Sequence, residues 1–422
     1  MNHKVENITV FEHQAIKVEQ VFETDHSNAK FTDEHLKLLE RFRGDNEDEF
    51  FPYYSLIHNG VKFKSYVGVI SVGGLQIEVL PKTDNSNKDE SKWRGHLLTM
   101  LKAVYKLQVQ SPSDATQTLK SSPILDVFLQ QFLDEVETLL HMGLIKTYRK
   151  ESGNRNALKG RLLINKQITK NIVHKEKFYV SYTTYDRNHL CNCILYKTLM
   201  IIPDVTGNTF IANRARTLRF EFPELNDVIV TDALFSTIHF DRKSEVYKDA
   251  IKIAKLILLN YMPDRLNRRN SVLALMFDMN RLWEEYVYVV LRRKLEKYEV
   301  SAQISKSFWE NRTIRPDIVI SSKYDEPLLV IDTKWKCPKD DRPSDADLKQ
   351  MYVYHKYWKV KNTILLYPDT NNREKVLGRF NDPDGNTTDL FCQMMFVSIN
   401  DFESSIQTKI SQILSNIDSM KQ

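Results

Sequence analysis

Cysteine and long apolar runs are scarce in this chain, and each shortage excludes a class of protein. Four cysteines among 422 residues are too few for a disulfide framework, and Cys191-Asn-Cys193 has no second pair at zinc-site spacing. The apolar runs, such as residues 251–259, are interrupted by lysines and fall short of the about 20 residues that span a bilayer. The amino terminus lacks the apolar core of a secretion signal. We therefore expect a cytoplasmic protein with reduced thiols and no membrane partner.

Three signatures of common enzymes are also missing. The sequence contains no phosphate-binding loop of the form G-x-x-x-x-G-K-[ST], which excludes a nucleotide-hydrolysing site of that class. Neither G-x-S-x-G nor H-E-x-x-H occurs, which argues against the common hydrolases and zinc proteases. We expect that the chain hydrolyses no nucleotide by itself.

The composition is that of an ordinary folded protein, with 42% hydrophobic and 27% charged residues, and the length suits two or three domains. The β-rich runs 66–71 and 75–80 flank Val72-Gly73-Gly74, which predicts a hairpin in a β-rich first domain, residues 1–110. Apolar positions at intervals of three and four predict a helical middle region, residues 111–262.

The segment 263–270 is polar, basic and begins with proline, so we place a boundary there, before a third domain of residues 263–422. We expect this domain to contain a long helix at about 273–297, a strand–turn–strand, a helix at about 345–359 and a strand at 363–366. This order indicates an α/β core. The fold class that we expect is therefore α/β, or α+β when the first domain is included.

Basic residues are concentrated in the middle region. The formal net charge of the whole chain is only +5, but the segment Lys146–Lys177 carries ten lysines and arginines against two glutamates. Such a density, with aromatic residues nearby, fits the phosphate backbone of DNA, and Arg155, Lys159 and Arg161 are the candidate contacts. A solvated basic face is the alternative that composition leaves open.

Two carboxylates and a lysine are predicted to meet on one hairpin of the third domain. Asp317 precedes the apolar run 318–320, and Asp332-Thr333-Lys334 ends the apolar run 328–331. Side chains alternate along a strand, so Asp332 and Lys334 point to the same face. Asp317 on the partner strand can join them if the register is suitable.

These residue types fit a metal-dependent phosphodiesterase. Two carboxylates and a main-chain carbonyl, for which Thr333 is the candidate, suffice to hold Mg²⁺ together with several waters. Mg²⁺ lowers the pKa of a bound water and stabilises charge on a phosphodiester, and Lys334 would orient that water or neutralise developing charge. An exposed salt bridge between hairpin strands would leave the same residues, and the pattern alone leaves both interpretations open.

The flanking helices offer further polar residues. Glu284 lies at the edge of the apolar stripe of the preceding helix, where it either reaches solvent or adds a third carboxylate. Asp347, Gln350 and Tyr354 share one face of the following helix. That face is either an ordinary polar surface or a wall that faces nucleic acid.

Asp317, Asp332-Thr-Lys334, Glu284 and Gln350 together resemble the core of PD-(D/E)xK nucleases. More narrowly, an ordered series of segments along most of the chain is similar to McrC, the nuclease subunit of methylcytosine-dependent McrBC restriction systems. The series comprises Tyr66-Val-Gly-Val-Ile70, Ile77-Glu-Val-Leu-Pro-Lys82, Gly143-Leu-Ile-Lys-Thr-Tyr148, Leu158-Lys-Gly-Arg-Leu162, Asp278-Met-Asn-Arg-Leu-Trp-Glu284, Gln350-Met-Tyr-Val-Tyr354 and Leu365-Leu-Tyr-Pro368.

The resemblance implies a partner and a set of roles. Proteins of this family act with McrB, an AAA+ GTPase that recognises modified DNA and translocates it; they bind that ring through their N-terminal part, stimulate GTP hydrolysis and supply the cutting site. Carried over by position, Asp317 and Asp332 are implied metal ligands and Lys334 is the implied catalytic lysine. Glu284 and Gln350 are implied accessory residues.

The leading hypothesis is a Mg²⁺-dependent DNA endonuclease subunit of a restriction system that cuts methylated DNA after an AAA+ GTPase has loaded it. One alternative is a scaffold subunit that activates an NTPase ring and does not cleave; another is a stand-alone nuclease. The intact set of Asp317, Asp332 and Lys334 favours cleavage, because a vestigial site has no chemical reason to keep all three residue types.

Overall fold

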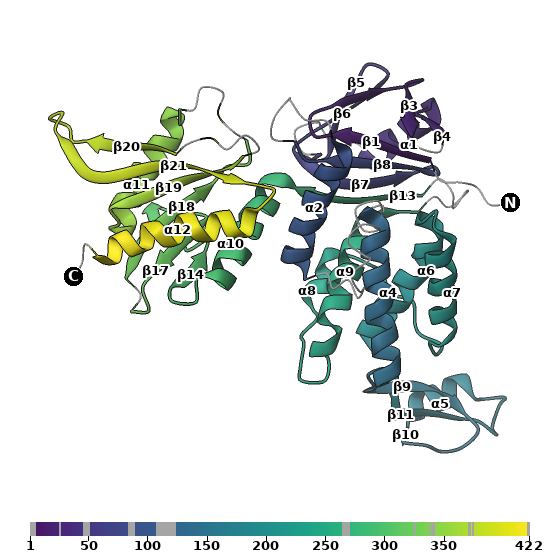
Figure 1. The fold of residues 1–422 in the computed structure, drawn as a ribbon. Helices are drawn as coiled ribbons and strands as arrows, with labels where there is room; N and C mark the ends of the chain where they lie inside the picture. Colours follow the sequence, from purple (N-terminus) through teal and green to yellow (C-terminus); the bar gives the residue numbers. More distant parts are fainter. Residues whose placement is uncertain are drawn as a thin grey trace.

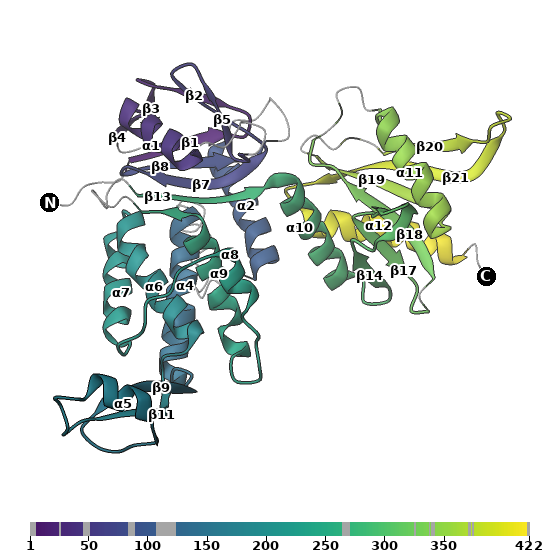
Figure 2. The same cartoon turned by 180° about the vertical axis from the view of Figure 1, so that it is seen from behind.

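The chain folds into three units in series, with a strand and a helix leading from the first two into the third (Figures 1 and 2). The computed structural model describes residues 6–24, 27–44, 51–82, 89–106, 124–263, 271–324, 326–336, 338, 342–369, 373 and 375–419. Within these residues, no helix combines the length and the apolar character that crossing a membrane requires. The fold is mixed α/β, as expected.

A five-stranded sheet is the centre of the first unit. Its strand order is β1-β8-β7-β13-β12, with β1 Glu6–Phe11, β8 Leu75–Leu80, β7 Tyr66–Val72, β13 Val272–Asp278 and β12 Tyr261–Met262. The predicted hairpin is confirmed, because β7 and β8 pair antiparallel around Gly73 and Gly74, both of which have positive φ. The smaller elements of this unit are β2 Ala15–Lys17, β3 Val21–Thr24, β4 Ser27–Lys30, α1 Asp33–Arg43, β5 Tyr54–Ile57, β6 Gly60–Phe63 and α2 Glu90–Tyr105.

The prediction of a helix from about residue 273 was wrong for residues 273–278. Residues 272–278 form β13, which pairs antiparallel with β7, so this stretch belongs to the first sheet. The run Val-Leu-Ala-Leu-Met-Phe is buried on both faces, and periodicity cannot distinguish such a strand from a buried helix. The helix α10, Met279–Lys294, starts where Asp278 caps it by accepting from the N–H groups of Asn280 and Arg281. The predicted boundary at 263–270 lies almost entirely outside the described residues.

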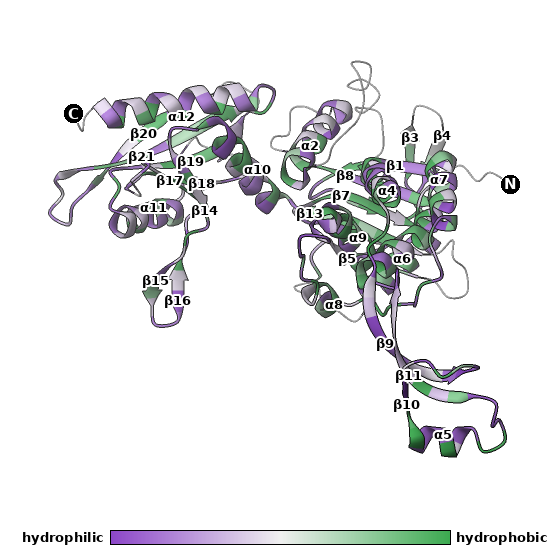
Figure 3. Cartoon of the chain, turned by 90° about the horizontal axis from the view of Figure 1, so that it is seen from below, coloured by the Kyte–Doolittle hydropathy of each residue, from purple (hydrophilic) through white to green (hydrophobic). Residues whose placement is uncertain are grey.

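Helices make up the body of the second unit, which lies under the first sheet in Figure 1. They are α4 Ile124–Met142, α6 Leu190–Val205, α7 Thr209–Phe220, α8 Asp232–Ser236 and α9 Lys248–Leu259. The basic segment leaves this body as a long arm, built from β9 Thr147–Arg155, β10 Arg161–Leu162, α5 Ile164–Lys170 and β11 Phe178–Asp186. β9 and β11 pair antiparallel along their whole length, and they carry α5 far from the other two units (Figures 1 and 3).

The third unit is a six-stranded mixed sheet with helices on both faces. Its strand order is β14-β17-β18-β19-β21-β20, with β14 Glu299–Ala302, β17 Ile318–Ser321, β18 Pro327–Thr333, β19 Asn362–Asp369, β21 Thr387–Ser398 and β20 Val376–Asn381. α11, Asp345–Trp358, covers one face, and α12, Phe402–Ser419, covers the other (Figure 3). A small hairpin, β15 Lys306–Trp309 and β16 Arg312–Ile314, projects from this unit (Figure 3). The predicted strand–turn–strand, helix and strand correspond to β17–β18, α11 and β19.

One buried hydrophobic cluster runs through all three units. It extends from Val67 of the first sheet through the helical body to Ile331 and Phe402 of the third unit. A separate cluster packs α11 against the opposite face of the third sheet. The third unit is therefore packed against the others through its α12 face, and its α11 face is left for the candidate active site.

Candidate active site

Asp317 lies one residue before β17, and the end of the partner strand β18 holds its carboxylate. Ile318 pairs with Ile331, so Asp317 comes beside Asp332. Thr333 donates two hydrogen bonds to Oδ2 of Asp317, from its backbone N–H at 2.6 Å and from its hydroxyl at 2.9 Å. The hairpin therefore brings the two aspartates together, as the sequence predicted.

Lys334 connects two carboxylates that come from different elements. Its Nζ lies 2.9 Å from Oδ2 of Asp332 and 3.0 Å from Oδ1 of Asp347, in the first turn of α11. Its backbone N–H donates to the carbonyl of Leu366 on β19 at 2.9 Å, which continues the sheet past the end of β18. Asp332 is only 2% exposed, whereas 30% of the Lys334 side chain is exposed, so the site opens to solvent at the lysine.

One face of α11 completes the wall of the site. Gln350 Nε2 donates to Oδ1 of Asp332 at 3.0 Å and to the Tyr354 hydroxyl at 2.7 Å, and that hydroxyl donates to the carbonyl of Arg315 at 3.1 Å. Asp347 lies on the same face, as its helical spacing from Gln350 and Tyr354 predicted. Its ion pair with Lys334, which makes it part of the site, was not predicted.

Glu284 borders the site from α10 but bonds to a neighbour. Its Oε1 accepts from Nε2 of Gln303 at 2.5 Å, and the backbone N–H of Gln303 donates to the carbonyl of Asp317 at 2.9 Å. Burial and the charge of Asp317 raise the pKa of Glu284. Glu284 therefore lies close enough to Asp317 to feel its charge, with the Gln303 amide holding its carboxylate.

The site holds more negative charge than its own cations neutralise. Burial, together with the charge of Asp317, raises the pKa of Asp332 to about 7, although Lys334 opposes the shift. Burial also raises the pKa of Asp317, against the hydrogen bonds from Thr333. Burial disfavours the charged form of Lys334, but the carboxylates of Asp332 and Asp347 outweigh it and raise the pKa of this ammonium. An additional cation would relieve the repulsion between Asp317 and Asp332.

The donor set fits a hydrated divalent cation better than a closed metal cage. No group of three or more His, Cys, Asp or Glu side chains in the described part of the chain is arranged to hold a metal ion. Mg²⁺ accepts one or two carboxylates and keeps several waters, so Asp317 and Asp332 suffice as protein ligands. The pKa of each of these two carboxyl groups is raised, chiefly by burial, so a cation bound between them would stabilise their charged forms. The Thr333 carbonyl stays a predicted third ligand.

The predicted DNA contacts lie on the arm, away from the carboxylates. Arg155 ends β9 and lies over the ring of Tyr182, with its guanidinium carbon 4.7 Å from the ring centre, and Lys159 Nζ lies 5.7 Å from the same centre. Arg161 starts β10. Gly160, between them, has φ +85°, and a Cβ there would lie 2.3 Å from the carbonyl oxygen of Ser181. The backbone at this turn therefore requires glycine. All three cations are exposed on the surface of the arm.

The arm also exposes apolar side chains, which sequence reasoning did not include. They follow the basic turn on α5 and the loop after it: Ile164 at 63%, Ile168 at 62%, Ile172 at 66% and Val173 at 84% exposure. A surface that combines cations with aliphatic groups suits either DNA or a protein partner.

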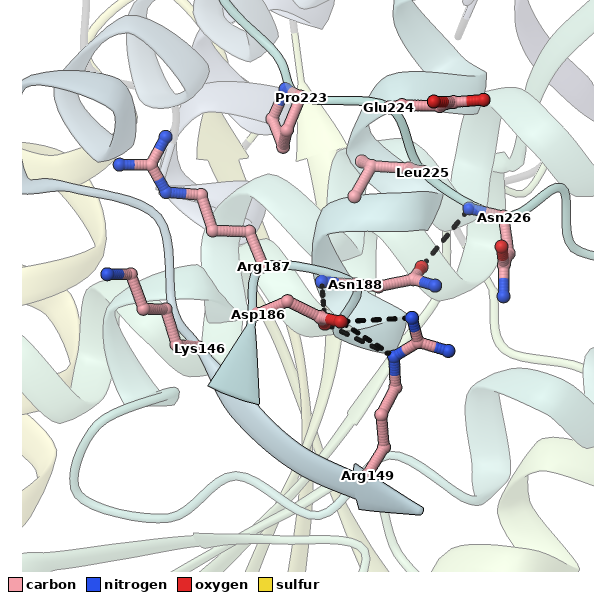
Figure 4. Close-up of a pocket in the computed structure, with 9 residues that line it drawn as sticks. All are labelled: Lys146, Arg149, Asp186, Arg187, Asn188, Pro223, Glu224, Leu225 and Asn226. Atoms are coloured by element: carbon pink, nitrogen blue, oxygen red, sulfur yellow. Dashed lines mark hydrogen bonds and ion pairs between the residues drawn. The ribbon is translucent and has the colours of Figure 1, made fainter. Parts of the chain in front are cut away.

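A polar pocket of about 450 Å³ lies at the base of the arm (Figure 4). Arg149 bonds Asp186 there through Nη2 at 2.9 Å, and the guanidinium holds the pKa of Asp186 below its ordinary value. Asn188 Oδ1 accepts from the backbone N–H of Asn226 at 3.1 Å, which ties the end of β11 to the loop after α7 (Figure 4). These contacts fix the arm to the helical body, and none of them involves a residue of the candidate active site.

Comparison with known proteins places this chain in a family. Residues 61–368 match the family described as McrBC 5-methylcytosine restriction system component. The chain belongs to this family. The matched segment contains the end of the first unit, the arm, Glu284 and the Asp317–Lys334 hairpin.

Two kinds of relative accompany this match. The Type IV methyl-directed restriction enzyme EcoKMcrBC of Escherichia coli K12 is 23% identical over 239 residues, which are 52% of this chain and 66% of that protein, slightly under two thirds. A refined half-complex from a tetradecameric assembly of Thermococcus gammatolerans McrB AAA+ hexamers with bound McrC contains a chain with the same fold. The match covers 96% of this chain and 100% of that chain, at a TM-score of 0.67 and 20% identity.

Proposed function

We propose that this chain is the metal-dependent DNA endonuclease subunit of a McrBC-type restriction system. The observation that carries the proposal is the convergence of Asp317, Asp332 and Lys334 at the end of one hairpin, with Gln350 bonded to Asp332. A structural ion pair requires only one carboxylate beside the lysine. Here the half-buried carboxylate of Asp317 lies beside the buried carboxylate of Asp332 that pairs with the lysine, at an electrostatic cost that a bound cation would offset.

Each residue has a role that follows from its contacts. Asp317 and Asp332 would hold Mg²⁺ through their carboxylate oxygens. When bound, Mg²⁺ supplies Lewis acidity, which makes water more acidic and neutralises charge on the phosphodiester. Gln350 fixes the orientation of Asp332, and Thr333 fixes that of Asp317. Lys334, whose side chain is 30% exposed, would hold a phosphate oxygen or orient the attacking water.

The partner in this proposal is an AAA+ GTPase ring of the McrB type. The proposal draws on the Thermococcus assembly, which joins McrB AAA+ hexamers to McrC, and on the absence of a phosphate-binding loop from this sequence. The substrate is DNA, and the methyl-directed action of the Escherichia coli relative suggests methylated DNA. A scaffold that activates the ring without cleaving, and a stand-alone nuclease, are the alternatives that the experiments below separate.

Mg²⁺ binding should depend on pH through Asp332. Below about pH 7 the carboxyl holds a proton, so Mg²⁺ must displace it and the affinity should fall about tenfold per pH unit. Without metal, the folded state keeps this proton up to about pH 7 and the unfolded chain loses it near 3.8, so the free energy of unfolding should decrease as pH rises through that window. The groups around Asp332 are Asp317, Lys334, Asp347 and Tyr354.

Thermal denaturation with and without MgCl₂ at a series of pH values checks this prediction. The increase in Tm on adding Mg²⁺ should be larger above pH 7 than below it, and Asp332→Asn, which lacks one of the two ligands, should show little increase at any pH. An equal Mg²⁺ effect at all pH values in both proteins would argue against Asp332 as the ligand.

Neutralising the basic turn of the arm should weaken DNA binding. Replacing Arg155, Lys159 and Arg161 with glutamine removes up to three phosphate contacts, and each lost contact should reduce the log–log salt slope by about 0.9. Binding isotherms at several salt concentrations measure the slope. The control replaces Arg216, Arg242 and Lys243, exposed cations of the helical body, and should leave it unchanged. If the slope of the arm variant equals that of wild type, the arm serves as a protein-binding surface or a solvated face.

A further inference from the structure

A buried hydrogen bond connects the first unit to the residue that follows Lys334. Oε1 of Glu12 accepts from Nε1 of Trp335 at 2.7 Å, across 323 residues of sequence. Both side chains are buried, with Glu12 5% and Trp335 1% exposed. The bond therefore belongs to the packed junction between the two units.

Glu12 is itself held firmly by the first sheet. It follows the last residue of β1; its backbone N–H donates to the carbonyl of Leu80, and its Oε1 also accepts from the backbone N–H of Lys82 at 2.9 Å. Its second oxygen lies 3.6 Å from Nε2 of His13. Burying a carboxylate is costly unless hydrogen bonds compensate, and burial raises the pKa of Glu12. This buried carboxylate lies where the first unit packs against Trp335.

Trp335 is fixed on its other side by α10 and α12. Its ring meets that of Trp283 edge to face, with 5.5 Å between the centres, and Trp283 packs in the same way on Phe402 at 5.0 Å. Trp283 directly precedes Glu284, and Trp335 directly follows Lys334. The chain neighbours of two candidate site residues therefore form the aromatic junction, and Glu12 provides its polar contact from the first unit.

The geometry points to Glu12 as a positioning residue for the candidate active site. By holding the Trp335 indole, Glu12 fixes the chain just past β18, and with it the Lys334 ammonium between Asp332 and Asp347. The bond from Lys334 N–H to Leu366 fixes one end of this segment, and the Glu12–Trp335 bond fixes the other. This inference rests on the proposed nuclease function, and it makes the first unit, where we expect the ring to dock, part of the support of the cutting site.

Four variants of the full chain test this inference. Trp335→Phe keeps the ring on Trp283 and removes the N–H donor, and Glu12→Leu removes the acceptor. Glu12→Gln keeps an amide oxygen that can accept from Trp335, so it should behave as wild type. Trp93→Phe is the matched control, because Trp93 is a buried tryptophan on α2 whose ring packs edge to face on that of His96.

Two readouts separate positioning from general stability. The acylation rate of Lys334, measured by mass spectrometry against the exposed Lys323, should increase several-fold in Trp335→Phe and Glu12→Leu, because the ammonium is released from its carboxylates. In cleavage assays with the GTPase partner and GTP, kcat should fall about 10- to 100-fold in these two variants, with KM nearly unchanged. The double variant should be no worse than the more impaired single variant.

The positioning role of Glu12 can be contradicted by the labelling and by the kinetics. Lys334 labelling and kcat that equal the Trp93→Phe values in folded Trp335→Phe and Glu12→Leu proteins would overturn the inference. If Glu12→Leu does not fold, Trp335→Phe decides alone. If the wild-type assembly cleaves no DNA, the proposed function fails, and the labelling rates still show whether Glu12 positions Lys334.

Discussion

Replacing Asp332 with alanine should abolish DNA cleavage by the assembled system while the chain stays folded. Asp332 provides one of the two carboxylates for the metal, forms an ion pair with Lys334 and accepts a hydrogen bond from Gln350. Its replacement by alanine removes all three interactions. We expect cleavage to fall by roughly 10³-fold or more. Lys334→Ala should have a similar effect on cleavage without removing the metal. Cleavage of plasmid DNA with partner and GTP measures both effects.

Stability gives this prediction its internal control. The charged form of Asp332 is disfavoured by burial and by Asp317, so alanine should not lower Tm by more than a few degrees. Asp241 and Lys243 repeat the same acid–any–lysine spacing on the surface of the helical body, and Asp241→Ala should cleave as wild type. Wild-type cleavage by Asp332→Ala would refute the site and assign the cutting to residues elsewhere in the assembly.

Cleavage and GTP hydrolysis should appear only when the chain and its ring are mixed. The sequence offers no loop to hold nucleotide phosphates, so the isolated chain should show negligible GTPase activity and little cleavage of long DNA. With the cognate AAA+ GTPase, both activities should rise together, by at least about 100-fold over either protein alone. Steady-state GTP hydrolysis and plasmid cleavage, followed in the same reactions, measure the effect.

This test needs the whole chain. Deleting residues 1–80 would remove β1, β7 and β8, leave β13 paired only with the two-residue β12, and uncover the hydrophobic cluster to which Val67 and Leu80 belong. Such a deletion would report on folding rather than on docking. Robust cutting of unmodified DNA by the isolated chain with Mg²⁺ alone would favour the stand-alone nuclease. Stimulated GTP hydrolysis with no cleavage would favour the scaffold.

The sequence predicted the centre of the candidate site because that centre is local. Asp332 and Lys334 are two residues apart on a strand, and Asp317 lies opposite across a tight hairpin, so strand alternation and pairing place all three. The α11 face followed from helical spacing. The ion pair of Asp347 with Lys334 was not predicted, because a carboxylate in the first turn of a helix is common for reasons of capping and helix dipole, and nothing local identifies its partner.

The junction could not be predicted in the same way. β13 is a buried apolar run that fits a strand or a helix equally, and only its pairing with β7, about 200 residues earlier, decides between them. The contact between Glu12 and Trp335 depends on how whole units pack, which no local pattern encodes. The exposed apolar residues of α5 are likewise visible only once the arm stands clear of the body.

Manganese anomalous diffraction tests the central claim most directly, because it locates the metal without reference to activity. Crystals of the chain soaked in Mn²⁺ as a substitute for Mg²⁺ should show an ion about 2 Å from one carboxylate oxygen of Asp317 and one of Asp332, and no such ion in Asp332→Ala crystals. An anomalous map without a peak between these carboxylates, with Lys334 still paired to Asp332, would contradict the account and leave the trio as a structural ion pair.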